Sequence, residues 1–228
     1  MSGSSRITEA ANPITRNIDI CPNASSLIRL LSQTDAQIFT GVDTHPSLLD
    51  IDLSGAVESA VEAWQHPQGV VVVAGAGASG NLAAFVCTRL SALAERLGAT
   101  CRAEYLVAGG DEALLRVGEA SAEDDAQVAV SDLDDLLKKF GTGVVSYIGV
   151  SCSLSAVYVG AQLEHIMNMQ EAHPESRIHA TLIGFNPPSS LQPVQVSGWC
   201  STAKANLDRF LSSVAVAHGG RPEGRGRQ

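Results

Sequence analysis

The stretch GVVVVAGAGASG at residues 69–80 decides the fold of this chain. Its four consecutive valines, bounded by glycine, are typical of a short strand that is buried on both faces of a parallel sheet. The glycine-rich turn leads into residues 81–97, where apolar side chains recur every three or four positions, as on one face of a helix. A strand, a tight turn and a helix in this order predict the first unit of an α/β fold.

The alternation of strands and helices continues along the chain. Apolar runs predict strands at 103–107, 143–150 and 180–185, and helical spacing predicts helices at 124–140 and 156–169. Strands that are apolar on both faces need helices on both sides of their sheet. We therefore expect a three-layer α/β fold in which a parallel sheet of four to five strands is flanked by helices.

Apolar positions mark one face of each of two predicted helices. In helix 124–140 we expect Val128, Leu133, Leu136 and Leu137 to face inward. The corresponding apolar face of helix 81–97 consists of Leu82, Phe85, Val86, Leu90, Leu93 and Leu97.

The two ends of the chain differ from its middle. Residues 25–38 and 53–64 predict helices, so we expect a helical segment over residues 1–65. The α/β domain then covers residues 66–190. Residues 191–228 form a divergent tail that we expect to be partly disordered, because its last ten residues contain no apolar side chain.

Composition limits the class of protein. Among 228 residues, 24 acidic and 15 basic side chains give a formal charge of −9, the wrong sign for binding nucleic acid or an anionic membrane. The longest apolar run, 69–78, is shorter than the ~20 residues that a membrane-spanning helix needs, and no signal peptide is visible. Five cysteines without Cys-x-x-Cys spacing indicate reduced thiols and no zinc site, so we expect a cytoplasmic protein without a metal.

Two loops follow the carboxyl ends of predicted strands, where such folds bind ligands. Residues 75–80 offer glycine-rich backbone and the Ser79 hydroxyl to an anion. Residues 151–155, SCSLS, place three serines before another helix. A shared polyhydroxyl or phosphate pocket would use both loops. The alternatives are a glycine turn that binds nothing, an ordinary capped helix start and, for Cys152, a small buried thiol.

Two further patterns have more than one interpretation. Residues 75–80 also match the G-x-G-x-x-G motif of dinucleotide-binding folds. In those folds an acidic residue follows the motif by ~20 residues and binds the ribose. Here the first acid beyond the next strand is Asp111, which lies much farther from the motif. The acids Glu119, Glu123 and Asp124 precede a helix. They either cap it and complement its dipole, or accept hydrogen bonds from sugar hydroxyls, or act as a base.

Five segments in ordered succession carry a family resemblance: NPITRNID at 12–19, LLSQTDAQIF at 30–39, YLVAGGD at 105–111, GVSCSLSAVYVGAQ at 149–162 and GFNP at 184–187. Together with the two loops, they resemble sugar isomerase (SIS) domains, which bind phosphosugars. They are most similar to the family of the glucokinase regulatory protein and the bacterial N-acetylmuramic acid 6-phosphate etherase. The resemblance implies a flavodoxin-like SIS fold over the α/β domain and stops after residue 188.

The resemblance leans toward the regulatory side of that family. The etherases keep a catalytic glutamate nine residues after the last glycine of the first loop, and this chain has Arg89 there. A guanidinium does not give up a proton near neutral pH. The resemblance therefore implies a regulatory protein that senses fructose phosphates, without catalytic residues or a cofactor. The alternatives are an etherase-like lyase with Glu119 or Glu123 as its base, or an inactive shortened remnant.

The resemblance also implies a binding site and partners. Ser79, Glu123 and Ser151 match the residues that hold the sugar phosphate in the family, whereas Ala78 replaces a threonine and Ser153 replaces a glycine. The implied partners are a sugar phosphate, a hexokinase- or glucokinase-type protein and a second copy of the chain, and the resemblance allows a nuclear location. The full predicted phosphosugar-binding set is Gly77, Ala78, Ser79, Gly80, Glu123, Ser151, Cys152, Ser153 and Ser155.

Overall fold

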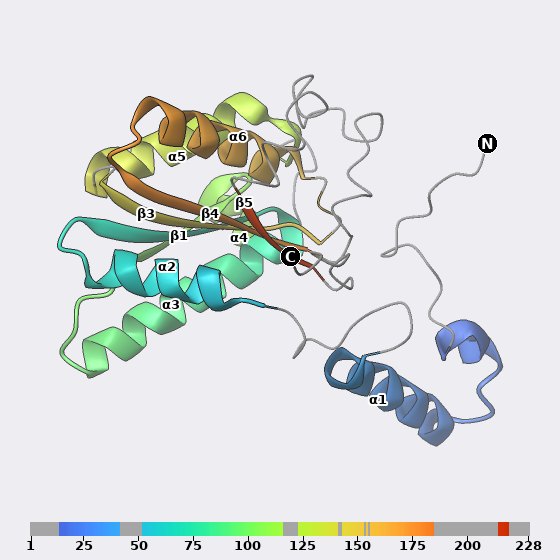
Figure 1. The fold of residues 1–228 in the computed structure, drawn as a ribbon. Helices are drawn as coiled ribbons and strands as arrows, with labels where there is room; N and C mark the ends of the chain where they lie inside the picture. The colour runs from blue at the N-terminus through green and yellow to red at the C-terminus, as the bar shows by residue number, and fades with distance from the viewer. Residues whose placement is uncertain are drawn as a thin grey trace, which may run out of the picture.

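The computed structural model describes residues 14–41, 52–115, 123–140, 143–152, 154, 156–184 and 214–218. Within these ranges helices separate successive strands from β1 to β4, as expected, and a short additional helix, α4, precedes α5 (Figure 1). The elements are the 3-10 helix η2 (Thr15–Ile20), α1 (Ala24–Thr40), α2 (Ser54–Gln65), β1 (Gly69–Gly75), α3 (Gly77–Arg96), β2 (Ala103–Val107), α4 (Gly110–Leu115), α5 (Ala126–Phe140), β3 (Val144–Val150), α6 (Val157–Ala172), β4 (Arg177–Gly184) and β5 (Val214–His218).

The strands form one parallel sheet in the order β2-β1-β3-β4-β5. Helices α2 and α3 cover one face, and α5 and α6 cover the other (Figure 1). This confirms the predicted three-layer α/β fold, and the strand order is that of flavodoxin-like proteins. β5 lies within the segment expected to be a tail, where it pairs with β4 as the fifth strand.

The valines of β1 divide between two hydrophobic layers. Val70 and Val72 pack with residues of α5 and α6, whereas Val71 and Val73 pack with residues of α2 and α3. Side chains alternate between the faces of a strand, so a run that is apolar at every position supplies both layers. Burying each of these valines stabilises the fold by ~1.5–3 kcal/mol, and all of β1 is buried.

The predicted helix is confirmed as α3, but its large apolar side chains do not face the sheet. Phe85 is 57% exposed and Leu97 is 73% exposed, and the guanidinium of Arg89 lies 5.2 Å from the centre of the Phe85 ring. Small side chains face the sheet instead, which lets the helix approach closely. Of the six large apolar positions, Leu82, Phe85, Val86, Leu93 and Leu97 are exposed and only Leu90 packs against the core, while Gly80, Ala83, Ala84, Cys87 and Ala94 are buried.

Smaller differences concern α5 and the ends of the elements. Leu133, Leu136 and Leu137 are buried as expected, but Val128 is exposed and its neighbour Ala129 is buried in its place. β4 begins at Arg177, three residues before the predicted start, because polar side chains on its exposed face hid the strand pattern. Residue 185, its predicted end, lies outside the described residues.

The N-terminal helices are described in part. α1 begins after Asn23, whose Oδ1 accepts a hydrogen bond from Ser26 N at 2.9 Å, and α1 contacts η2. α2 packs on β1 and β3. No helix in the described ranges combines the length and the apolar character needed to cross a membrane. The domain boundaries at residues 65 and 190 remain predictions.

Gly184 has no space for a side chain. A Cβ atom there would overlap Leu154 Cδ2 and lie 2.5 Å from the carbonyl oxygen of Ser151. Leu154 is fully buried and has a φ of 58°, so it has little freedom to move. We expect Gly184→Ala to lower the free energy of unfolding by about 2 kcal/mol, measured by urea unfolding.

Gly143→Ala is the matched control, because a Cβ atom on Gly143 would meet nothing within 4 Å. Its stability should differ from that of the parent chain by less than about 0.5 kcal/mol. Equal stabilities of the two variants would contradict the close packing of Leu154 on β4.

Candidate functional site

The first predicted loop lies between β1 and α3. β1 ends at Gly75, and the amides of Ser79 and Gly80 donate to the carbonyl oxygen of Ala76 at 3.1 and 3.3 Å, which closes the first turn of α3. A Cβ atom on Gly75 would lie 2.6 Å from the carbonyl carbon of Ser79, so this turn requires glycine. Ser79 is half-buried, whereas Gly77 is exposed and Gly80 is buried. The exposed start of α3 therefore presents backbone amides and a hydroxyl at the carboxyl end of β1.

The second predicted loop starts beside the first. Gly75 and Val150, the last residues of β1 and β3, are partners in the parallel register. Ser151 follows at only 3% exposure, and its amide donates to Ile183 O at 2.9 Å. Its Oγ accepts from the amide of Ala156 at 3.3 Å, at the start of α6. The hydroxyl hydrogen of Ser151 can still donate to a ligand.

The other residues of the second loop are described in part. Cys152 is exposed, so its interpretation as a small buried thiol was wrong. Ser153 and Ser155 lie outside the described residues.

Glu123 lies against the first loop, although it is distant in sequence. A Cβ atom built on Gly77 would lie 2.9 Å from Glu123 Oε1, and Gly77 has a φ of 53°. The structure thus brings together Glu123 and the glycine loop. Sequence reasoning proposed Glu123 by resemblance, and no local pattern connects it with Gly77.

The helix cap in this region is a different acid. Asp125 Oδ1 accepts from the amides of Gln127 and Val128 at 3.0 Å, and α5 begins at Ala126, two residues after the predicted start. The residue that caps α5 is therefore Asp125, not Glu123 or Asp124. Glu119 lies outside the described residues.

The arrangement offers hydrogen-bond donors and an acceptor at the carboxyl ends of β1 and β3. Amides and hydroxyls at two helix starts are donors for an anion, and the carboxylate of Glu123 is an acceptor for hydroxyl groups. Arg89, at the position of the etherase glutamate, is exposed and stacks on Phe85. In the described part of the chain, no cluster of three or more His, Cys, Asp or Glu residues is arranged to hold a metal ion.

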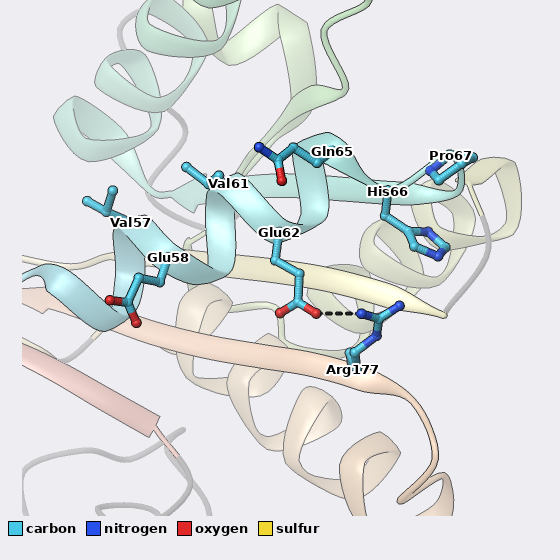
Figure 2. Close-up of a pocket in the computed structure, with 8 residues that line it drawn as sticks. All are labelled: Val57, Glu58, Val61, Glu62, Gln65, His66, Pro67 and Arg177. Atoms are coloured by element: carbon cyan, nitrogen blue, oxygen red, sulfur yellow. Dashed lines mark hydrogen bonds and ion pairs between the residues drawn. The ribbon is translucent and has the colours of Figure 1, made fainter.

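Figure 2 shows a pocket at the opposite, amino-terminal ends of the strands. It has a volume of about 490 Å³ and lies between α2 and the start of β4. The guanidinium of Arg177 donates to Glu62 Oε1 at 2.7 Å, and His179 Nε2 lies 3.5 Å from Glu62 Oε2. Sequence reasoning did not single out these residues. Their contacts fasten α2 to β4, and ligands of such sheets bind at the other end.

The strand order and the helices on both faces of the sheet define a doubly wound α/β protein. Residues 52–167, about half of the chain, match the family model described as the glucokinase regulatory protein N-terminal SIS domain. The chain therefore belongs to this family.

Named relatives agree with the family match. The chain is 32% identical to glucokinase regulatory protein of Rattus norvegicus and 31% identical to that of Homo sapiens, each over 218 residues and 90% of this chain. It is 29% identical to the Xenopus laevis protein over 214 residues. These alignments cover 32–33% of the relatives, so the chain spans about a third of their length.

Two thiols, Cys87 and Cys152, differ in burial. Cys87 is 1% exposed, and burial raises its pKa to about 12, so at pH 8 it is almost entirely in the unreactive thiol form. Cys152 is exposed. We expect iodoacetamide to modify Cys152 more than about a hundredfold faster than Cys87 at pH 8, measured by peptide mass spectrometry. In denaturant the rates should converge, and similar rates in the folded chain would contradict the burial of Cys87.

Proposed function

We propose that this chain binds a sugar phosphate at the carboxyl ends of β1 and β3 and acts as a regulatory domain without catalysis. The observation that supports this most is the approach of Glu123 to Gly77, which pairs an acceptor of hydroxyl hydrogen bonds with a donor-rich helix start. A phosphorylated sugar needs both kinds of group within one site.

Each residue has a distinct role in this proposal. The phosphate binds to the hydroxyls of Ser79 and Ser151 and to the amides at the start of α3, with Ser153 as a further donor. Glu123 accepts hydrogen bonds from the sugar hydroxyls. Family resemblance supports a fructose phosphate as the ligand. Ala78, which replaces a threonine, removes one donor and so favours a shift in preference among fructose phosphates.

The relatives' name supports a protein partner. We propose that the bound sugar phosphate changes the affinity of this chain for a glucokinase- or hexokinase-type protein. The relatives' name, glucokinase regulatory protein, supports a partner of this kind. The residues of such an interface are not part of this proposal, because the chain spans only a third of those proteins.

Thermal unfolding with added ligand tests the binding site. Fructose 6-phosphate or fructose 1-phosphate at 100 times its dissociation constant should stabilise the chain by ~2.7 kcal/mol, and fructose without phosphate should not. Ser79→Ala and Glu123→Gln each remove one predicted contact, so each should weaken binding about tenfold.

Glu58→Gln is the matched control, since it neutralises a carboxylate of the pocket in Figure 2 and should leave ligand affinity unchanged. Inorganic phosphate and N-acetylmuramic acid 6-phosphate are compared in parallel. Absence of stabilisation by either fructose phosphate, in a cooperatively unfolding sample, would contradict the proposal. Preferential stabilisation and turnover of the muramic acid ester would establish the lyase instead.

Protection of Cys152 locates the ligand. Cys152 directly follows Ser151, so a saturating fructose phosphate should slow its alkylation at least about fivefold. Cys21, which follows η2 and is not one of the predicted ligand-binding residues, serves as the internal reference. Stabilisation without protection of Cys152 would place the ligand at another site.

A further inference from the structure

β2 is an edge strand of the sheet that the structure describes. In the described residues β2 pairs only with β1 and is the first strand of the sheet. Val71 N donates to Arg102 O at 2.9 Å, and Ala108 N donates to Gly75 O at 3.2 Å. Successive residues of a strand direct their backbone groups to opposite sides. The even-numbered residues of β2 therefore face β1, and Ala103, Tyr105 and Val107 direct their N–H and C=O groups outward.

A groove lies beside β2. It has a volume of about 580 Å³ and is lined by β2, the start of α4, α5 and one side chain of α6. Leu106, Leu136 and Phe140 form apolar parts of its lining. The groove could therefore hold alternate side chains of a strand that runs along β2.

Acidic side chains outnumber basic ones in the groove. Glu104, Asp111, Asp132 and Asp135 line it against Lys139, and Asp135 also forms an ion pair of 2.7 Å with Lys138. Tyrosine hydroxyls orient two of these carboxylates, from Tyr105 to Asp111 at 2.9 Å and from Tyr158 to Asp132 at 2.7 Å. Each carboxylate has further lone pairs for a cation.

We propose that β2 accepts an extended segment of a partner protein that carries lysine or arginine at alternate positions. The partner's backbone pairs with Ala103, Tyr105 and Val107. Its basic side chains lie in the groove beside Glu104 and Asp132, as cross-strand neighbours do in a sheet. This site uses none of the sugar-phosphate residues and stands independently of that proposal.

Charge argues for this occupant over a second copy of the chain. If the β2 strands of two copies paired, Glu104 and the other acids of one groove would lie near the acids of the second groove. Repulsion between these like charges opposes such a dimer. A basic segment neutralises the same acids.

The test uses a fluorescent peptide of alternating valine and lysine, about seven residues long, the length of an ordinary strand. Its anisotropy is titrated with the folded full chain at low salt. We expect saturable binding with a dissociation constant below about 1 mM. Glu104→Gln combined with Asp132→Asn should weaken binding at least about tenfold, because the cationic side chains lose their partners. Glu58→Gln, at the other end of the sheet, should not.

Modified peptides keep the test independent of how the variants fold. Methylation of the amide nitrogens along one edge removes the strand-pairing donors and should abolish binding, and a glutamate peptide should not bind. Absence of saturable binding would overturn the proposal. So would equal binding of the methylated peptide, which would reduce the interaction to charge alone. A dimer in sedimentation that the peptide dissociates would assign the edge to a second copy.

Discussion

The close approach of α3 to the sheet is the constraint on which the candidate site depends. A Cβ atom on Gly80 would lie 2.7 Å from Val107 Cγ1 and 2.9 Å from the carbonyl oxygen of Gly75. Only glycine allows this contact. This close contact holds the first turn of α3 at the end of β1, so the glycine loop lies next to Glu123. Ala83, Ala84 and Cys87 continue the close contact along the helix.

Buried polar contacts hold the layers in register beneath that loop. Ser59 of α2 and Ser146 of β3 share a hydrogen bond of 2.9 Å between their hydroxyls. On the other face the hydroxyl of Tyr147 donates to Gln162 Oε1 at 2.8 Å, and Gln162 Nε2 donates to Ala129 O at 2.9 Å. An unpaired polar group at these depths would cost about 1–3 kcal/mol, so these contacts disfavour sliding of the helices along the sheet.

The sheet could be read from the sequence because a buried parallel strand leaves a local pattern, and the valines of β1 show it. The packing of α3 could not be predicted from the sequence. Helical periodicity identifies large apolar residues whether they face the core or solvent, and small residues such as Ala83 and Ala84 contribute little to the pattern. The first loop was predictable from its glycines. The contact of Glu123 with Gly77 joins residues that lie far apart in the sequence, and no spacing rule encodes it.

The strand order has a consequence for how the chain is made. β1 lies between β2 and β3, and Gly69 pairs with Val144. One edge of the valine strand therefore stays without its partner until residues 144–150 have been synthesised. At ~5–20 residues per second this interval lasts several seconds. Non-local parallel pairing is also slow, because a long loop must close first. During that interval the most apolar strand of the protein is also the one most open to aggregation, so chaperone binding to nascent chains should centre on residues 69–75.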